Sequence, residues 1–406
     1  MEPDGVDAWE LSIPRTVQFG WGRFGDVSSW VAALGSRVWL VRGGKSLDQT
    51  GTLTRLNDLC LAAGIPVETI KRVTAEPSVS AVAESLRQLY QRSTDGVVVV
   101  AIGGGSTIDF GKALACLITT LTPERLNNLK EIDWEDTVIG YLEGVGKGYT
   151  IDREPLPLIA IPTTAGTGAE ATRNAVISCS LRRFKKSLRS PLMIPRVALI
   201  DPQLCVGCPV EVTKCSGLDA ITQLIEAFVC RVRRPLVRAL VLDVLPAAVR
   251  SLPRVIADGS DKTAWEAMSQ AALVSGIALA HSGLGMAHGI AAALGVECGT
   301  PHGKACAVLL PTALATNRKV CQVDFALLER AINPNGGGND CVCADRFVER
   351  MTQLVGECGV VSRLSHLGLR ADRIEWLAAN SSGSSMSGNP VVLVQDELER
   401  ILQDIY

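Results

Sequence analysis

Residues 96–113 read GVVVVAIGGGSTIDFGKA, and this stretch decides the class of fold. Its unbroken apolar run at 97–102 is typical of a strand covered on both faces, as the strands of a parallel sheet are. Three glycines follow directly, and a helix is predicted from Thr107 to Leu117. A buried strand, a glycine-rich turn and a helix, in that order, indicate an α/β sheet domain.

The same alternation continues on both sides of this stretch. It predicts further strands at 36–41, 66–70, 156–161 and 197–200, and helices at 53–63 and 79–92. Strands and helices that alternate in this way form parallel sheets with right-handed crossovers. We therefore predict that the N-terminal half of the chain is one α/β domain.

From about Gly217 the pattern changes to long helical periods with few β-branched runs. Helices are expected over 218–232, 236–251, 262–279 and 390–406, and surface loops at 333–340 and 381–390. Proline and glycine in DPQLCVGCPV (201–210) mark the change. We predict an α/β domain over residues 1–203 and an all-helical domain over residues 204–406.

Composition excludes several classes of protein. The chain has 406 residues, 47% of them hydrophobic, and a formal net charge of −2 without a basic block. Nucleic acid and membrane surfaces are therefore excluded as main partners, since both require clustered Lys and Arg. The start, MEPDGVDAWELSIPRT, lacks the basic and apolar regions of a signal peptide, and no apolar run reaches the about 18 residues of a membrane span. A soluble, cytoplasmic protein is expected.

The cysteines are numerous but do not form an obvious motif. There are 13 of them, an odd number in a long chain without an export signal, so we expect reduced and mostly buried thiols. Cys205 and Cys208 form a CxxC, and Cys341 and Cys343 form a CxC more than 130 positions later. A structural zinc site needs two such pairs at suitable spacing. Both pairs are therefore predicted to be inert.

Two turns at predicted strand ends favour a nucleotide. Gly103, Gly104 and Gly105 allow a diphosphate to approach the backbone, and the next helix offers the free N–H groups of its first turn. The turn PTTAGTG (162–168) follows another apolar strand and carries three threonines. Ligands of open α/β sheets bind at such strand ends. Dinucleotide binding is the favoured interpretation, although glycine-rich turns also occur for steric reasons alone.

A third set of residues lies in the helical half. Asp219 and Gln223 are one helical turn apart, and His288 and His302 are two of only four histidines in the chain. One carboxylate with two imidazoles suits Fe²⁺ or Zn²⁺. Each histidine alone would more often be a hydrogen-bonded core residue. Sequence spacing cannot bring Asp219 to His302, so the fold has to decide.

Taken together, these motifs resemble the iron-containing (group III) alcohol dehydrogenase family. The resemblance rests on five segments in the family's order, which are GGGSTIDFGKA (103–113), IPTTAGTGAE (161–170), ALIDP (198–202), GLDAITQLIEAF (217–228) and GLGMAHGIAAALGVECGTPHG (283–303). It covers nearly the whole chain. It implies an N-terminal α/β dinucleotide-binding domain, an all-helical C-terminal domain, a dehydroquinate synthase-like architecture and an active site in the cleft between the domains.

The resemblance also implies roles for residues of the N-terminal half. The glycine loop would hold the cofactor diphosphate, the threonine loop its adenosine and nicotinamide ends, and Lys185 its ribose, while Asn174 would lie beside the substrate. The cofactor residues expected are Gly43, Gly44, Ser46, Gly104, Gly105, Ser106, Asp109, Thr163, Thr164, Thr167 and Lys185.

The end of the first α/β strand indicates which dinucleotide is bound. Folds selective for NAD place a carboxylate at this strand end, where it accepts from the ribose 2′-OH. Residues 41–46 read VRGGKS and contain no Asp or Glu, while Arg42, Lys45 and Ser46 could meet a 2′-phosphate. NADP(H) is therefore expected in preference to NAD(H).

Two departures from the family concern the metal, which relatives hold with one Asp and three His. Asp219, His288 and His302 match three of these ligands, but Gln223 stands where a further His is expected. Its carbonyl oxygen is a poorer donor to Fe²⁺ or Zn²⁺ than imidazole. Three interpretations therefore remain open: Gln223 is the fourth ligand, Gln223 orients a metal-bound water, or the protein binds no metal. Ala292 replaces a second family His, and His281 would share a face with His288 if their helix is continuous.

The sequence thus predicts an NAD(P)-dependent alcohol dehydrogenase or aldehyde reductase. Its metal, held by Asp219, His288, His302 and Gln223, would act as a Lewis acid on a small alcohol or aldehyde, beside Asn174. A homodimer or larger homo-oligomer is expected from the family. Two alternatives remain open at this stage. One is a metal-independent enzyme similar to maleylacetate reductases, and the other is a nucleotide-binding pseudoenzyme.

Overall fold

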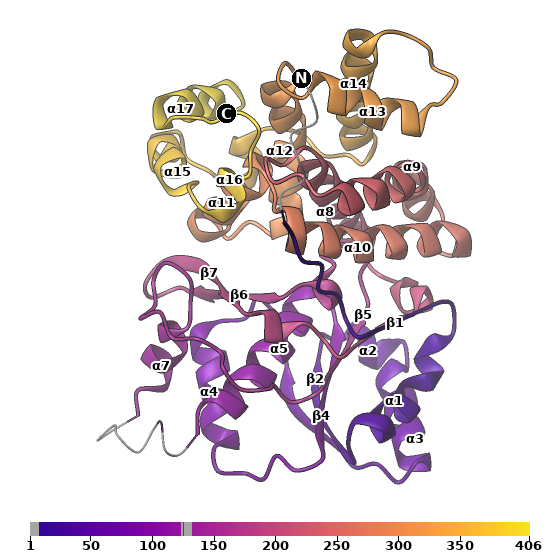
Figure 1. Ribbon diagram of the computed structural model, residues 1–406, viewed down its shortest axis with the longest axis vertical. Coiled ribbons are helices and arrows are strands. Elements are labelled where there is room, and N and C mark those ends of the chain that lie inside the picture. Colours follow the sequence, from indigo (N-terminus) through magenta and orange to yellow (C-terminus); the bar gives the residue numbers. More distant parts are fainter. Residues whose placement is uncertain (1–7, 123–124, 126–131) are drawn as a thin grey trace.

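The computed structural model describes residues 8–122, 125 and 132–406, so the first seven residues of the acidic start lie outside the described part. Figure 1 shows two halves, one built around a sheet and the other a stack of helices. The segment that precedes the first strand runs along the helical half before it joins the sheet. None of the described helices is by itself long and apolar enough to cross a membrane, and only a pair bent by 98° (Lys262–Ser282 with Met286–Cys298) meets that test jointly.

The N-terminal half is a six-stranded parallel sheet with the strand order β1-β8-β5-β4-β2-β3. Its strands are β1 (Thr16–Phe19), β2 (Arg37–Arg42), β3 (Val67–Arg72), β4 (Val97–Gly103), β5 (Leu158–Pro162) and β8 (Val197–Ile200). The predicted parallel sheet is confirmed. Strand β1 was not predicted, because four residues without an apolar run carry no recognisable period.

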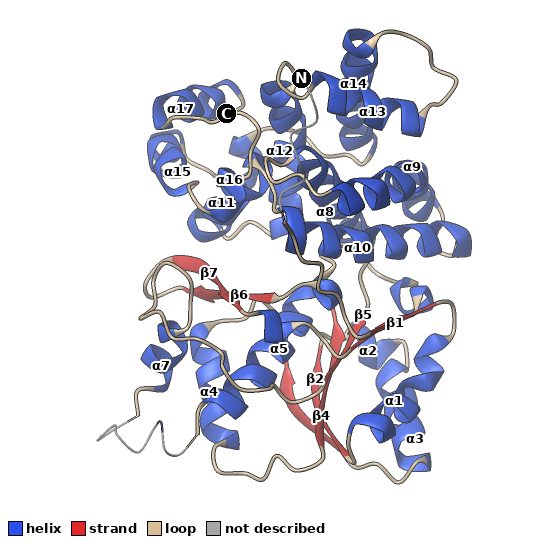
Figure 2. Cartoon of the chain, in the orientation of Figure 1, coloured by secondary structure: helices blue, strands red, loops and turns tan. Residues whose placement is uncertain are grey.

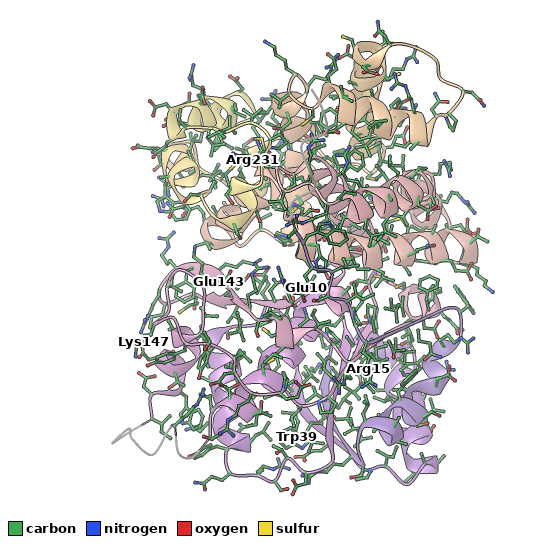
Figure 3. The ribbon with its side chains drawn as sticks, in the orientation of Figure 1. Glu10, Arg15, Trp39, Glu143, Lys147 and Arg231 are labelled. Carbon is green, nitrogen blue, oxygen red and sulfur yellow. The ribbon has the colours of Figure 1, made fainter. Side chains whose placement is uncertain are left out.

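The central strand β4 explains why the sheet is covered on both sides. Every residue of β4 is buried, and successive side chains point to opposite faces. Val98 and Val100 pack with α1 (Val27–Leu34) and α3 (Thr52–Ala62), while Val97 and Val99 pack with α4 (Val79–Leu89) and α5 (Gly105–Thr120). Figure 2 shows the helices on either side of the strands. In Figure 3, Trp39 of β2 lies among the packed side chains of this half.

Short elements complete the sheet half. They are η1 (Arg23–Asp26), α2 (Ser46–Gln49), α7 (Trp134–Gly140), η2 (Ala169–Ala171), η3 (Pro191–Met193) and η4 (Pro202–Cys205). An antiparallel hairpin, β6 (Asn174–Cys179) and β7 (Phe184–Arg189), lies at the edge of this half that faces the helices. The hairpin was not predicted, because the β7 sequence FKKSLR is polar and has no apolar run.

The C-terminal half is all-helical, as predicted. Its elements are α8 (Val210–Val229), α9 (Pro235–Ala257), α10 (Lys262–Ser282), α11 (Met286–Cys298), α12 (His302–Asn317), α13 (Gln322–Ile332), α14 (Asp340–Glu357), η5 (Leu364–Leu367), η6 (Ala371–Arg373), α15 (Ile374–Asn380), α16 (Ser384–Ser387) and α17 (Gln395–Asp404). Helix α8 is central, since all its residues from Gly217 onward are buried. It packs against α9, α10 and α12.

Two expectations for the C-terminal end are wrong. The helix expected over 390–406 begins only at Gln395, and the expected loop 381–390 contains the short helix α16. The chain after Pro390 is instead held by Asn317, whose side-chain oxygen accepts from the N–H of Val391 at 3.2 Å. A buried amide thus pins this stretch outside the helix, and no local sequence pattern shows such a long-range contact.

Candidate metal and active site

The glycine loop and the threonine loop begin side by side. Strands β4 and β5 are neighbours with Gly103 opposite Pro162, and Thr163 N–H donates to the carbonyl of Gly103 at 3.0 Å. A Cβ on Gly105 would lie only 2.5 Å from the hydroxyl oxygen of Thr167. Position 105 must therefore lack a side chain for the two loops to touch.

Helix α5 begins at these loops with an unusual N-terminus. Its N-cap, Gly104, has no side chain that could bond the first N–H groups. Those groups, together with the helix dipole, form an environment suited to an anion such as a diphosphate. The loop thus has both the open space and the donors that dinucleotide binding requires.

A cavity of about 510 Å³ lies between the two halves. Predicted site residues from both halves line it, namely Gly105, Ser106, Asp109, Thr167, Asn174, Lys185, Gln223, His288 and His302. Glu143, labelled in Figure 3 on the side of the sheet half that faces the helices, also borders it. The volume suits a small-molecule ligand. The fold therefore joins the nucleotide loops and the histidines in one cavity.

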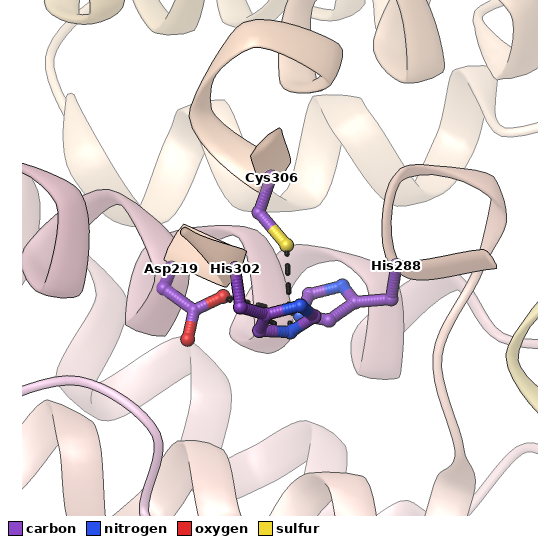
Figure 4. A group of neighbouring side chains, drawn as sticks. All are labelled: Asp219, His288, His302 and Cys306. Carbon is purple, nitrogen blue, oxygen red and sulfur yellow. Dashed lines mark hydrogen bonds and ion pairs between the residues drawn. The ribbon is translucent and has the colours of Figure 1, made fainter. Parts of the chain in front are cut away.

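Asp219, His288, His302 and Cys306 form a compact cluster at the helical wall of this cavity (Figure 4). Asp219 Oδ1 lies 3.3 Å from His288 Nε2 and 3.9 Å from His302 Nε2. The Cys306 sulfur lies 3.7 Å from His302 Nε2. One potential ligand atom from each of the four side chains lies within 4.8 Å of all the others.

Three helices bring the cluster together. Asp219 lies in α8, His288 in α11, and His302 is the first residue of α12. At position 303, a Cβ would lie 2.6 Å from the carbonyl oxygen of Cys215 in α8. Gly303 therefore lets the start of α12 approach α8 closely enough for His302 to face Asp219.

Glu226 holds His288 in place. Its carboxylate accepts from the N–H of Gly285 at 2.9 Å and from the N–H of Ala287 at 2.7 Å. It also lies 2.7 Å from His288 Nδ1. With Nδ1 bonded in this way, Nε2 is the nitrogen that faces Asp219 and the cluster.

The cluster strongly perturbs the ionisation of its members. Burial would raise the pKa of Asp219, but the two imidazoles outweigh it and lower this pKa to about 2. Burial would lower the pKa of His288, yet the acidic groups around it raise this pKa well above its usual range. Desolvation lowers the pKa of His302 to about 3, and burial raises the pKa of the Cys306 thiol to about 12.

A divalent metal fits this donor set. Within the described part of the chain, Asp219 Oδ1 and His288 Nε2 are buried polar atoms without a hydrogen-bond partner, and Gln223 Oε1 and His302 Nδ1 are too. Asp219 and His288 are only 1% and 4% exposed. Unpaired polar atoms are costly at such sites, and coordination would satisfy Asp219 Oδ1 and His288 Nε2. One carboxylate, two imidazoles and a thiol are all recognised ligands of Zn²⁺.

The remaining predicted residues lie around this centre. Gln223 donates its side-chain amide to Asp219 Oδ2 at 3.2 Å. Asn174 is buried at the start of β6, and Lys185 in β7 pairs with Glu76. Asp109 accepts from the N–H of Val176 at 3.0 Å. The hairpin missed by the sequence analysis thus carries two of the predicted site residues.

The predicted cofactor residues of the first strand lie beside the glycine loop. Gly43 follows β2, and its N–H donates to the carbonyl of Ile102 at 2.8 Å. Gly44 and Ser46 lie further along the turn into α2 and are not among the residues that line the 510 Å³ cavity. Thr164 lies next to Gly104, where a Cβ would be 3.4 Å from its hydroxyl oxygen.

His281 does not take part in the cluster. The condition that one continuous helix carries His281 and His288 is not met, because α10 ends at Ser282 and α11 starts at Met286 at an angle of 98°. His281 Nε2 instead lies 2.8 Å from the carbonyl oxygen of Ser12. Its role is therefore to fasten the N-terminal segment to the helical half.

Two members of this site, Glu226 and Cys306, were not predicted from the sequence. Both carry a helical signal, since Glu226 is two turns after Asp219 and Cys306 is one turn after His302. The cysteine analysis considered only closely spaced pairs, and Cys306 belongs to none of them.

Comparison with known proteins matches nearly the whole chain. A family model for iron-containing alcohol dehydrogenase matches residues 14–202, and a model for the C-terminal part of Fe-containing alcohol dehydrogenases matches residues 213–406. Probable alcohol dehydrogenase EutG of Salmonella typhimurium is 30% identical over 390 residues, which are 96% of this chain and 92% of that protein.

Two solved structures are also similar over almost their entire length. A 1,3-propanediol oxidoreductase has a TM-score of 0.87 at 26% identity, with 98% of this chain and 100% of that chain covered. Sulfoacetaldehyde reductase from Bifidobacterium kashiwanohense, in complex with NAD⁺, has a TM-score of 0.82 at 26% identity, with 98% of each chain covered.

Proposed function

The chain belongs to the iron-containing alcohol dehydrogenase family, and from this premise we propose that it transfers hydride between a nicotinamide dinucleotide and a small alcohol or aldehyde at a metal held by Asp219, His288 and His302. It is an oxidoreductase of the alcohol dehydrogenase type, as its relatives are. The dinucleotide, the metal and the substrate class are the proposal.

One observation supports the proposed hydride transfer. The cavity between the halves is lined on one side by the glycine and threonine loops and on the other by His288 and His302. A dinucleotide whose diphosphate binds at the start of α5 would extend through this cavity toward the cluster. Substrate and nicotinamide would then meet in the same enclosed space, as hydride transfer requires.

The residues of the cluster have distinct roles in this proposal. Asp219, His288 and His302 would hold the ion, which when bound supplies Lewis acidity to the substrate oxygen. Glu226 keeps His288 in the tautomer that presents Nε2, and Gln223 holds the second oxygen of Asp219. Asn174 has a buried side-chain oxygen at the cavity that no described residue bonds, and it would accept a hydrogen bond from a substrate hydroxyl.

NADP(H) is proposed over NAD(H). The segment VRGGKS (41–46) at the end of β2 contains no Asp or Glu, and Lys45 and Ser46 are exposed there. Arg42 donates to both oxygens of Asp48 at 2.9 Å, so part of its charge is already paired. A 2′-phosphate would therefore meet Lys45 and Ser46 first, with Arg42 released from Asp48 on binding.

The test of the function compares metal content with turnover. Asp219→Ala is expected to remove the bound metal and to lower the reduction rate of an aldehyde panel by at least ~100-fold, because a ligand and a buried charge are lost together. Asp243→Ala, at an exposed position of α9, is the matched control and should match wild type. Full turnover in Asp219→Ala would contradict the metal role. Dinucleotide binding by the wild type without any turnover would indicate a pseudoenzyme.

The cofactor preference has its own test. In the wild type, kcat/KM is expected to be higher with NADPH than with NADH. Arg42→Ala/Lys45→Ala should lower kcat/KM for NADPH by about 10- to 100-fold, the worth of one or two charge-assisted hydrogen bonds, and leave the value for NADH nearly unchanged. A wild type that prefers NADH would overturn this part of the proposal.

A further inference from the structure

The metal cluster contains a fourth donor that the three proposed ligands do not account for. Cys306 lies one helical turn after His302 in α12, so both side chains project from the same face. Asp219 and Gln223 have the same spacing in α8. The sulfur of Cys306 points into the cluster and approaches His302 Nε2 to 3.7 Å (Figure 4).

Three of the separations between ligand atoms are close to those around a tetrahedral ion. Zn²⁺ lies about 2.0–2.3 Å from its N, O and S ligands, which places ligand atoms about 3.3–3.8 Å from one another. In the cluster, the separation is 3.3 Å from Asp219 to His288, 3.7 Å from Cys306 to His302 and 3.9 Å from Asp219 to His302, and all four ligand atoms lie within 4.8 Å of one another. Little movement would be needed to close this set around an ion.

Gln223 is engaged elsewhere. Its side-chain nitrogen donates to Asp219 Oδ2, whereas the oxygen that faces the imidazoles is Oδ1. An amide that supports the outer oxygen of Asp219 acts as a positioning residue for that ligand. Gln223, one turn after Asp219, thus positions a metal ligand, while Cys306, one turn after His302, can itself donate to the metal.

The polar atoms of the cluster are buried, and this burial favours the binding of a metal ion. The Cys306 side chain is completely buried. Beside it, Asp219 Oδ1 and His288 Nε2 are buried and have no hydrogen-bond partner among the residues that the structure describes. A thiol contact alone leaves these atoms unsatisfied, and an ion at their centre would satisfy all of them.

We propose that Cys306 is the fourth protein ligand of the metal, so that the donor set is Asp219, His288, His302 and Cys306. On binding, the thiol loses its proton to solvent and a sulfur–metal bond forms. Thiolate is a soft ligand that favours Zn²⁺ over Fe²⁺, so this chain would select zinc within a family named for iron. Zinc can expand beyond four ligands, which leaves access for a substrate oxygen. The inference rests on the proposed metal-dependent function.

The experiment replaces the native metal with Co²⁺ in the intact protein and records absorption. Cobalt bound by a thiolate shows an intense sulfur-to-metal charge-transfer band in the near ultraviolet, which oxygen and nitrogen ligands do not produce. The wild type should bind one Co²⁺ and show the band. Cys306→Ser should lose the band and bind Zn²⁺ at least 10- to 100-fold more weakly, the loss that even an outer-shell change produces.

A neighbouring thiol provides the control. Cys215 lies in α8 one turn before Asp219 and is not part of the cluster. Cys215→Ser should keep both the band and the zinc affinity. If the band instead disappears in Cys215→Ser and persists in Cys306→Ser, Cys306 is not the ligand.

Two further variants separate the possible failures. Cys306→Ala/Gln223→His should regain zinc affinity without the band, which distinguishes loss of a ligand from loss of the fold. Suppose that the wild type binds Co²⁺ without the band and that Asp219→Ala no longer binds Co²⁺. This result would overturn the Cys306 assignment and leave the proposed function intact. Wild-type protein that binds neither Co²⁺ nor Zn²⁺ would overturn both.

Discussion

At the scale of single residues, Glu226 decides which nitrogen of His288 faces the metal cluster. Its carboxylate satisfies two backbone N–H groups at the start of α11 as well as His288 Nδ1. The same carboxylate therefore fixes a helix start and a metal ligand. These three donors need three of the four lone-pair sites of a carboxylate, whereas an amide oxygen offers only two.

Glu226→Gln tests this role. The variant leaves one of the three donors unpaired or turns the imidazole, so we expect zinc affinity to fall about 10- to 100-fold. The measurement is competition against a chromophoric chelator. Glu297→Gln, in the last turn of α11, serves as control, because the Glu297 carboxylate pairs with Arg373 and Arg183 and not with the cluster. Equal affinities in all three proteins would contradict the role of Glu226.

Residue patterns in the sequence predicted part of the metal cluster. Asp219, His288 and His302 were identified from their residue types and from the family resemblance, and the fold does bring them together. Cys306 and Glu226 were not identified, because their helical spacing to His302 and Asp219 does not by itself show what they contact. Glu226 contacts His288 of another helix, and the cluster around Cys306 combines residues of α8, α11 and α12, which no spacing rule brings together.

At the scale of elements, helix α5 and the turn η2 each carry a buried ionisable side chain, Lys112 and Glu170. Lys112 in α5 is fully buried, and its ammonium donates to Thr172 Oγ1 at 2.6 Å and to the carbonyl oxygen of Asn174 at 2.7 Å. It thereby ties the glycine-loop helix to the start of the hairpin. Glu170 in η2 is also buried, and burial raises its pKa to about 7.

Glu170 predicts a pH dependence of stability. Its pKa is raised from 4.5 in the unfolded chain to about 7 in the folded protein, so the folded state binds more protons between these values. The free energy of unfolding should therefore be highest below pH 4.5 as far as Glu170 contributes, and should fall as pH rises toward 7, by at most roughly 3 kcal/mol. Glu170→Gln should remove this slope and be more stable than wild type at pH 8.

Urea unfolding at pH 5, 6, 7 and 8 is the measurement. Glu375→Gln, at an exposed position of α15, should keep the slope of the wild type. A Glu170→Gln protein that retains the slope, or that is less stable than wild type at pH 8, would show that Glu170 is charged and stabilising in the folded state.

Elements with a strong period were predicted well. The buried strand at 96–102 and the strand at 197–200 are found as β4 and β8, and the helix at 262–279 as α10. The hairpin was missed because its β7 strand is polar and its pairing is antiparallel beside a parallel sheet. Whether a helix continues from His281 to His288 was left open by the sequence, and the structure has a break there that contains Gly283 and Gly285.

At the scale of the whole molecule, the two halves touch directly at glycines. A Cβ on Gly276 in α10 would lie 2.1 Å from the carbonyl oxygen of Gly168, at the end of the threonine loop. This close contact sets how near α10 lies to the strand ends, and hence the width of the cavity beside it. The sequence predicted two domains, with a boundary at 203/204 that stays a prediction, but the contact between them depends on packing across the cleft.

The central claim is that reduction depends on a metal held at the helical wall of this cavity. The most direct test strips wild-type protein with a chelator and titrates Zn²⁺ back while aldehyde reduction with NADPH is followed. The account predicts that activity disappears on stripping and returns in proportion to bound zinc, to a limit of one ion per chain, with no return in Asp219→Ala. Full activity in the metal-free wild type would contradict it.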